Sequence, residues 1–198
     1  MTPRPDVSEH RKNQIIQAAM TVFARSGFHK ATMDDIVVES GLSKGTLYWY
    51  FKSKDEIIST VVDNFFRQEF DQINPILSED IPAKQKLLRI TDLFIADLAL
   101  MQPIMSITFE YISLALREED IRRSFYHYYH NYIEFLTSII QEGIGLGEFR
   151  SVNPGDAAIA IASVMEGSIL LWIYDPESVD LERHTRNSVQ LLIEGLSA

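Results

Sequence analysis

The chain has 198 residues, of which 46% are hydrophobic and 23% are charged, a composition typical of globular proteins and unlike that of disordered or collagen-like chains. It contains no cysteine, which excludes disulfide scaffolds, thiolate zinc sites, iron–sulfur clusters and thiol nucleophiles. Its net charge of −10, from 18 basic and 28 acidic residues, argues against a polyanionic partner when the whole chain is counted.

The charge is unevenly distributed along the chain. Residues 1–55 contain eight basic and six acidic residues and carry a net charge of +2, which leaves −12 for the remainder. This asymmetry predicts two functions in one chain, with the first segment as the candidate for nucleic-acid binding.

Apolar residues recur with helical spacing throughout, and no alternating strand pattern is bounded by hairpin turns. Because proline and glycine separate the apolar segments, we expect an all-α fold of about nine helices. The expected helices run from Glu9 to Ser26, Met33 to Ser40, Lys44 to Phe51, Lys54 to Asn74, Pro82 to Met101, Pro103 to Arg117, Glu119 to Gly143, Gly155 to Tyr174 and Val179 to Leu196.

Three domains or segments follow from this pattern. Residues 1–8 are expected to form a flexible tail, residues 9–69 a three-helix DNA-binding domain, and residues 70–198 a helical domain for ligand binding and dimerisation. In the first domain, Thr32 stands three residues before Asp35 as in a capping box, and Gly41 separates two short helices. Residues 32–51 therefore fit a helix-turn-helix motif.

The second helix of this motif has an inward and an outward side. At about 100° per residue, Leu47 and Phe51 share the inward side, whereas Gly45 and Trp49 lie nearly opposite. An outward glycine weakens a helix and suggests that something approaches its backbone. Hydroxyls, phenols, lysines and the free amides of the helix N-terminus are groups that bind phosphates. The alternative is that the three aromatic residues at positions 48–50 only pack in the core or at an interface.

These residues resemble the DNA-binding domain of TetR/AcrR (tetracycline-repressor) regulators. The resemblance covers Arg11 to Asn64 and includes R-x-x-I-x-x-A-x-x-x-F, Gly27–Phe28, T-x-x-D-I from Thr32, G-L-S-K-G-T-L-Y-W-Y-F from Gly41, and K-x-K-x-E-I after it. It implies a homodimeric, mostly repressing transcription factor whose C-terminal domain binds a small-molecule inducer. The positions that match the family's DNA contacts are Thr32, Ser43, Lys44, Gly45, Thr46, Tyr48, Trp49, Tyr50 and Lys54.

The C-terminal two-thirds is rich in methionine and aromatic residues, which could line a cavity for a bulky apolar or cationic effector. The alternative is a dry core with its glutamates in water. The candidate pocket residues are Met101, Met105, Phe109, Glu110, Phe125, Tyr128, Tyr129, Tyr132, Met165, Glu166 and Trp172.

Other chemistry finds little support. His127, His130 and Glu134 share a helical face, but no cysteine is near, and we expect no metal site. Because the sequence has no P-loop, G-x-G-x-x-G or G-x-S-x-G motif and no paired catalytic carboxylates, we expect neither an enzyme nor a cofactor.

The last two helices carry small and branched residues at helical spacing, which predicts a four-helix dimer interface unless both helices pack only within the subunit. The segment from Ala157 to Tyr174 is long enough to span a membrane, but its small residues and Glu166 favour a buried helix and no membrane partner. The candidate interface residues are Ala157, Ala160, Ile161, Val164, Ser168, Leu171, Val189, Leu192, Ile193 and Leu196.

We therefore expect a cytoplasmic, ligand-responsive repressor that binds a palindromic double-stranded DNA operator as a homodimer and is nucleoid-associated when bound. An effector would shift the helix that begins at Lys54 and separate the two recognition helices. The alternatives are a helical-bundle carrier or enzyme that retains a helix-turn-helix without DNA binding, and an activator of the same family.

Overall fold

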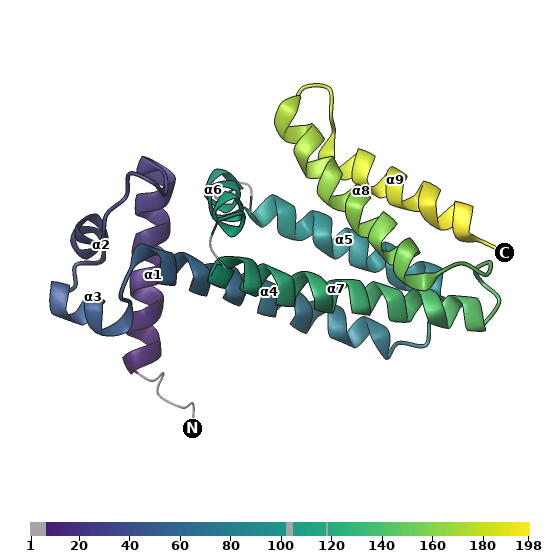
Figure 1. Ribbon diagram of the computed structural model, residues 1–198, viewed down its shortest axis with the longest axis horizontal. Helices are drawn as coiled ribbons and strands as arrows, with labels where there is room; N and C mark the ends of the chain where they lie inside the picture. Colours follow the sequence, from purple (N-terminus) through teal and green to yellow (C-terminus); the bar gives the residue numbers. More distant parts are fainter. Residues whose placement is uncertain (1–6, 102–104, 118) are drawn as a thin grey trace. The chain divides into compact units, whose positions relative to one another are not determined.

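The computed structural model describes residues 7–101, 105–117 and 119–198. Within these ranges the chain forms nine helices and no strand, which confirms the all-α fold (Figure 1). Most of the predicted tail lies outside the described residues, but Val7 and Ser8 already belong to the first helix. The helices are α1 (Val7–Ser26), α2 (Met33–Ser40), α3 (Lys44–Tyr50), α4 (Lys54–Leu77), α5 (Ala83–Met101), α6 (Met105–Ala115), α7 (Glu119–Gly145), α8 (Pro154–Tyr174) and α9 (Leu181–Leu196).

The chain divides into two compact units. The first contains residues up to Arg67 together with 101–125, and the second contains 68–100 and 126–198. The sequence analysis placed 101–125 in the C-terminal domain, whereas the structure groups them with the N-terminal helices. The reason is apolar packing, because Ile121 is buried in the same cluster as the N-terminal core and Phe125 packs against that cluster.

The first unit is built around the apolar side of α1. Ile15, Ala19, Val22 and Phe23 recur at helical spacing on this side and are fully buried. The ring of Phe23 meets that of Phe28 edge-on, with centroids 5.1 Å apart. The core therefore holds the loop after α1, from which α2 and α3 follow.

The second unit contains a buried lysine. Lys86 on α5 is 2% exposed, and its Nζ donates hydrogen bonds to both carboxylate oxygens of Glu142 at 2.8 Å and to the carbonyl oxygen of Leu77 at 3.1 Å. These contacts join α5 to α7 and to the end of α4 and satisfy the charge that is buried there.

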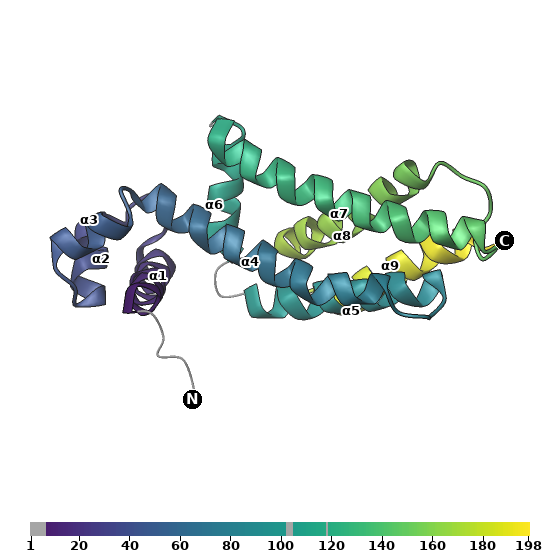
Figure 2. The same cartoon turned by 90° about the horizontal axis from the view of Figure 1, so that it is seen from below.

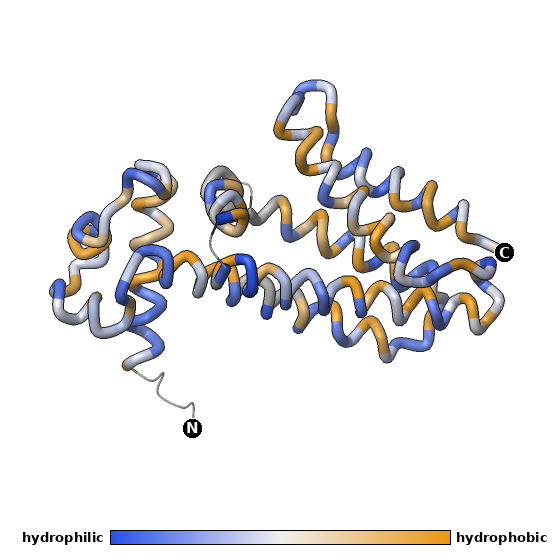
Figure 3. The backbone as a smooth tube through the Cα atoms, in the orientation of Figure 1, coloured by the Kyte–Doolittle hydropathy of each residue, from blue (hydrophilic) through white to orange (hydrophobic). Residues whose placement is uncertain are grey.

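Two helices, α8 and α9, lie side by side in both ribbon views (Figure 2). Figure 3 shows hydrophobic segments recurring along both of them. In length and composition α8 is apolar enough to cross a membrane, and 39% of its most apolar window is buried. On α9, the buried residues Val189, Ile193 and Leu196 follow helical spacing.

Most helix ends lie within two residues of the sequence prediction, and the end of the fourth helix differs by three. The expected end of the fourth helix at Asn74 placed Pro75 as a terminator, but α4 continues through Pro75 to Leu77. Ile73 and Ile76 are both almost completely buried, so apolar packing on both sides of the proline holds the helix beyond the hydrogen bond that Pro75 cannot donate.

Candidate nucleic-acid interface

A tight turn connects α2 to α3. Gly41 adopts the left-handed conformation with φ 66°, and its amide donates hydrogen bonds to the carbonyl oxygens of Val37 and Val38. Ser43 then caps α3 by accepting a hydrogen bond from the amide of Thr46 at 3.1 Å. The turn and the cap fix the direction in which α3 leaves α2, as a helix-turn-helix requires.

The start of α2 is fixed by the predicted capping box. The hydroxyl of Thr32 accepts a hydrogen bond from the amide of Asp35 and donates one to its Oδ2, which also accepts the amide of Thr32. These hydrogen bonds favour the ionised carboxylate and hold the pKa of Asp35 below its usual value. Thr32 is exposed, but part of its hydrogen-bonding capacity is already used inside α2.

The inward side of α3 is as the periodicity predicts. Leu47 and Phe51 are buried, and Ile36 of α2 belongs to the same cluster. Tyr48 and Tyr50 are half-buried and pack against this cluster. The alternative that the aromatic residues of α3 pack in the core therefore holds for part of each of these two side chains. Both phenols remain candidates for phosphate contact.

The outward side of α3 presents polar groups and one indole. Trp49 is 70% exposed, and its ring meets that of Tyr50 edge-on at 4.6 Å. Gly45 is exposed, and a Cβ built there would have only Oγ of Ser43 nearby, at 3.9 Å. A larger side chain would therefore fit within the fold at this position. The glycine leaves the outer surface of α3 open to a partner.

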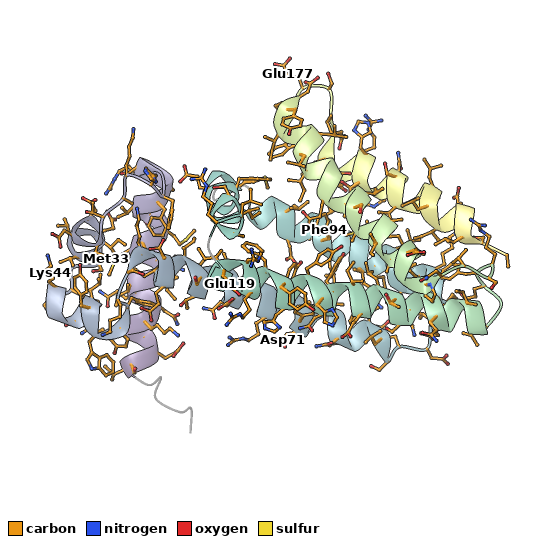
Figure 4. The ribbon with its side chains drawn as sticks, viewed as in Figure 1. Met33, Lys44, Asp71, Phe94, Glu119 and Glu177 are labelled. Carbon is orange, nitrogen blue, oxygen red and sulfur yellow. The ribbon has the colours of Figure 1, made fainter. Side chains whose placement is uncertain are left out.

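The charge on this side is that of Lys44, which is labelled in Figure 4 and forms an ion pair. Nζ of Lys44 lies 2.6 Å from Oδ1 of Asp34, and both side chains are more than half exposed. Asp34 raises the pKa of Lys44 by hydrogen bonding and by charge. An exposed pair of this kind contributes little stability, so a phosphate oxygen can replace Asp34 as the partner of the ammonium.

The two lysines after α3 are engaged with the backbone. Lys52 donates through Nζ to the carbonyl oxygen of Tyr48 at 2.6 Å. Lys54, which the family resemblance matches to a DNA contact, instead donates to three carbonyl oxygens of the loop between α1 and α2. Because an ammonium has three donors, Lys54 is engaged structurally in this conformation.

The predicted effector residues do not gather in one unit. Met105, Phe109, Glu110 and Phe125 belong to the first unit, and the side chain of Met101 lies outside the described part of the chain. The second unit contains the other six, of which Met165 and Tyr132 are buried, Tyr128 and Trp172 half-buried, and Tyr129 and Glu166 exposed.

Some of these residues are brought together. The hydroxyl of Tyr132 lies 3.3 Å from Sδ of Met165, and the ring of Tyr128 stacks on that of Tyr132 with centroids 6.1 Å apart. Desolvation raises the pKa of Glu166, although part of the side chain reaches solvent.

Glu110 has a role in the structure that the sequence did not suggest. Its Oε2 accepts a hydrogen bond from the amide of His29 at 3.3 Å, within the first unit. This contact joins α6 to the loop after α1 across 81 residues of sequence. No local pattern could have revealed it, because it depends on how α6 packs.

The predicted dimer stripe needs correction. Five of its residues (Ile161, Ser168, Val189, Ile193 and Leu196) are buried within the chain itself and cannot present their side chains to a second copy. Ala160 and Leu171 are exposed, and Ala157, Val164 and Leu192 are half-buried. Three of the five lie on α9, where the amphipathic pattern marks the side that packs inside the chain, whereas on α8 only Ile161 and Ser168 of the stripe are buried. The large exposed apolar residues of the two helices are Ile159, Leu170, Leu171, Ile173, Tyr174 and Leu191.

His130 of α7 makes local contacts on the surface. His130 stacks on Tyr126, with centroids 5.6 Å apart, and its Nε2 lies 3.2 Å from Oε1 of Glu134. Among the residues that the structure describes, no group of three histidine, aspartate or glutamate side chains could hold a metal ion.

The chain matches two family profiles. Residues 15–61 match the profile described as bacterial regulatory proteins of the tetR family, and residues 83–194 match the C-terminal profile of BetI-type transcriptional repressors. The first profile covers the helix-turn-helix, and the second covers more than half of the chain.

Relatives of similar length match over most of both chains. The HTH-type transcriptional regulator YfiR of Bacillus subtilis is 32% identical over 184 residues, which cover 87% of this chain and 85% of YfiR. The fatty acid metabolism regulator protein of the same organism is 26% identical over 92% of this chain and 94% of its own length.

Solved structures share the fold. FadR of Bacillus subtilis in complex with stearoyl-CoA superposes with a TM-score of 0.79 at 25% identity, covering 93% of this chain and 98% of FadR. A transcriptional regulator from Saccharomonospora viridis in complex with choline superposes with a TM-score of 0.84 at 20% identity, covering 96% of this chain and 99% of that one.

Proposed function

The chain belongs to the TetR family of transcriptional regulators, and we propose that it is a repressor that binds a palindromic operator as a homodimer and is released by a small molecule. The observation that carries this proposal is the outward side of α3, where Ser43, Lys44 and Trp49 stand on a helix whose inner side is anchored by Leu47. A helix held in this way fits the major groove.

Each group on this side has a separate role. Lys44 exchanges Asp34 for a phosphate, and the hydroxyls of Ser43 and Thr46 bind the backbone at the N-terminus of α3. Trp49 is 70% exposed and contacts base edges or a thymine methyl group. Phosphate contacts set the affinity, and Trp49 sets the base preference.

The homodimer forms through α8 and α9. Their exposed large apolar residues, Ile159, Leu170, Leu171, Tyr174 and Leu191 among them, supply a surface of the kind that subunits cover. Two copies then present recognition helices to half-sites about 34–36 Å apart, one turn of DNA.

The effector is a lipophilic or cationic molecule that binds the helical C-terminal part of this cytoplasmic protein. A relative at 25% identity has been solved with stearoyl-CoA, which supports an effector with a long apolar portion. The effector moves α4, which runs from the first unit into the second. This movement separates the α3 helices of the two subunits. Its effect on DNA affinity equals its preference for the released state.

The decisive experiment is selection of bound fragments from genomic DNA, followed by salt titrations on the selected site. Lys44→Ala should weaken binding to all sequences alike and reduce the salt slope by about 0.9 per subunit. Trp49→Phe should alter base preference at fixed positions and leave the slope unchanged. Lys84→Ala, a substitution on α5, is the control and should change neither.

The proposal would be refuted by the absence of a selected palindrome, or by a Lys44→Ala variant with unchanged affinity and slope. If the selected site controls genes that are expressed less when the protein is deleted, the protein is an activator and the repressor part of the proposal fails.

A further inference from the structure

Asp97 is a buried carboxyl group in the second unit with one oxygen unused. The residue is 8% exposed and lies on α5. A hydrogen bond with Gln72 of α4 engages the carboxyl group, but among the described residues Oδ2 is buried and has no hydrogen-bond partner. Native proteins leave few buried polar atoms in this condition, so each requires an explanation.

The same side of α5 carries a second buried charge, that of Lys86, which has a structural role. Lys86 and Asp97 are about three helical turns apart and differ by only about 20° around the helix axis. Lys86 has a carboxylate and a carbonyl oxygen as partners. The partner of Asp97 is the side-chain amide of Gln72, and no described cation contacts it. A carboxylate left without a counter-charge in the core destabilises the fold, which makes Asp97 a poor structural element.

The surroundings of Asp97 on α5 are apolar and aromatic. Ile90 and Phe94 lie within about 60° of it around the helix axis, Leu98 is the next residue, and all three are buried; Figure 4 labels Phe94 on α5. Elsewhere in the second unit, Tyr132 and Met165 are also buried and in contact. Apolar and aromatic walls with one convergent charged group are typical of small-molecule sites, and aromatic rings favour cations.

From the unpaired oxygen and its apolar surroundings, we propose that Asp97 binds the positively charged nitrogen of the effector, an organic ammonium ion with an apolar body. This inference rests on the proposed effector response and names the chemical class of the molecule. The ammonium supplies the missing counter-charge at Oδ2, while Gln72 holds the carboxyl group in place.

An ammonium explains the site better than a neutral donor does. A neutral hydroxyl would satisfy the hydrogen bond but leave a buried negative charge uncompensated. Burial also raises the pKa of Asp97, because the apolar surroundings penalise its charged form. A cationic ligand restores the charged form and gains a charge-assisted hydrogen bond.

The test uses three probes with one skeleton and different head groups: phenylbutylamine, phenylbutanol and phenylbutyrate. Their binding to the full-length protein is measured by isothermal titration calorimetry in the absence of DNA. The wild-type protein should bind phenylbutylamine at least about tenfold more tightly than either of the others. Asp97→Asn should lose at least about tenfold in affinity for the amine, about 1.4 kcal/mol, and change less than about twofold for phenylbutanol.

Asp71→Asn is the matched control, since it removes the same charge from an exposed position on α4. It should leave the affinity for phenylbutylamine unchanged. Equal binding of the amine by wild type and Asp97→Asn would overturn the proposal, as would a wild-type protein that binds phenylbutylamine no more tightly than phenylbutanol. If Asp97→Asn does not fold, the comparison of the probes on the wild-type protein still tests the proposal.

The result is separable from the proposed DNA function. Selective binding of the amine through Asp97 without any selected operator would refute the proposed DNA-binding function and leave this inference unchanged. A palindromic operator released only by stearoyl-CoA, with no amine binding, would do the reverse.

Discussion

Replacing Lys54 by methionine should destabilise the first unit, because Lys54 joins the start of α4 to the loop between α1 and α2. Its Nζ lies 2.8 Å, 2.9 Å and 3.1 Å from the carbonyl oxygens of Phe28, His29 and Ala31, and 4.8 Å from the centroid of the Phe28 ring. Methionine keeps the length and the apolar stem of lysine and removes the donors and the charge.

The expected loss is about 2–3 kcal/mol of unfolding free energy. Two of the three carbonyl oxygens, those of Phe28 and Ala31, are in part-buried hydrogen bonds, and we count about 1 kcal/mol for each. The cation over the Phe28 ring adds roughly 0.5–1 kcal/mol. The third hydrogen bond, to His29, is exposed and contributes little, since water replaces the ammonium there.

Urea denaturation at one fixed protein concentration measures this loss, because subunit association would otherwise add to the apparent stability. Lys30→Met, on the same loop and exposed, is the matched control and should change the unfolding free energy by less than about 0.5 kcal/mol. A salt titration on operator DNA adds a second reading. If Lys54 acts through the loop, affinity falls and the slope is unchanged, whereas a direct phosphate contact would lower the slope by about 0.9.

The reasoning would be refuted if Lys54→Met were as stable as Lys30→Met. A reduced salt slope with unchanged stability would instead return Lys54 to the DNA contacts that the family resemblance implies.

Two further predictions concern the second unit. Gly143→Ala should cost more than about 2 kcal/mol in urea denaturation, because its Cβ would collide with the ring of Phe149 and lie 2.9 Å from Cβ of Ala83; Gly145→Ala, with nothing within 4 Å, should change stability by less than about 1 kcal/mol, and equal effects would contradict the packing. Burial raises the pKa of Asp97 above its ordinary value of 3.8, so the stability that the protonated carboxyl group contributes is lost as pH rises from that value through the folded pKa. The stability of Asp97→Asn relative to wild type should therefore increase as pH rises above about 4, and a difference that stays constant from about pH 3 to about pH 8 would contradict this.

The sequence predicts best the features that depend on residues close together in the chain. The capping box at Thr32, the glycine turn at Gly41 and the burial of Leu47 each depend on spacings of a few residues, and the structure has all three. Local chemistry determines them, because the hydrogen bonds and the turn that they need lie within one or two helical turns.

Contacts between distant segments could not be predicted in this way. Lys54 reaches carbonyl oxygens 23 to 26 residues earlier in the chain, and Glu110 reaches an amide 81 residues earlier. A lysine that follows a helix such as α3 is equally compatible with phosphate binding and with capping a loop. Only the folded loop distinguishes these two roles. The interface prediction on α9 differs from the structure for another reason, since an amphipathic pattern marks Val189, Ile193 and Leu196 as packed but does not tell packing inside the chain from packing between subunits.

The net charge of +2 over residues 1–55 now has a more specific meaning. Lys44 is paired with Asp34, Arg25 is paired with Glu39 at 3.1 Å, and Lys54 is bound to backbone carbonyl oxygens. These three basic residues of the described part of the chain are therefore already partnered. Affinity for DNA must depend on a few exchangeable contacts, chiefly Lys44 and the N-terminus of α3, with each phosphate displacing an existing partner. Because those partners are exposed, the exchange costs little, and in the proposed homodimer strong binding requires that both subunits make these contacts at the correct spacing.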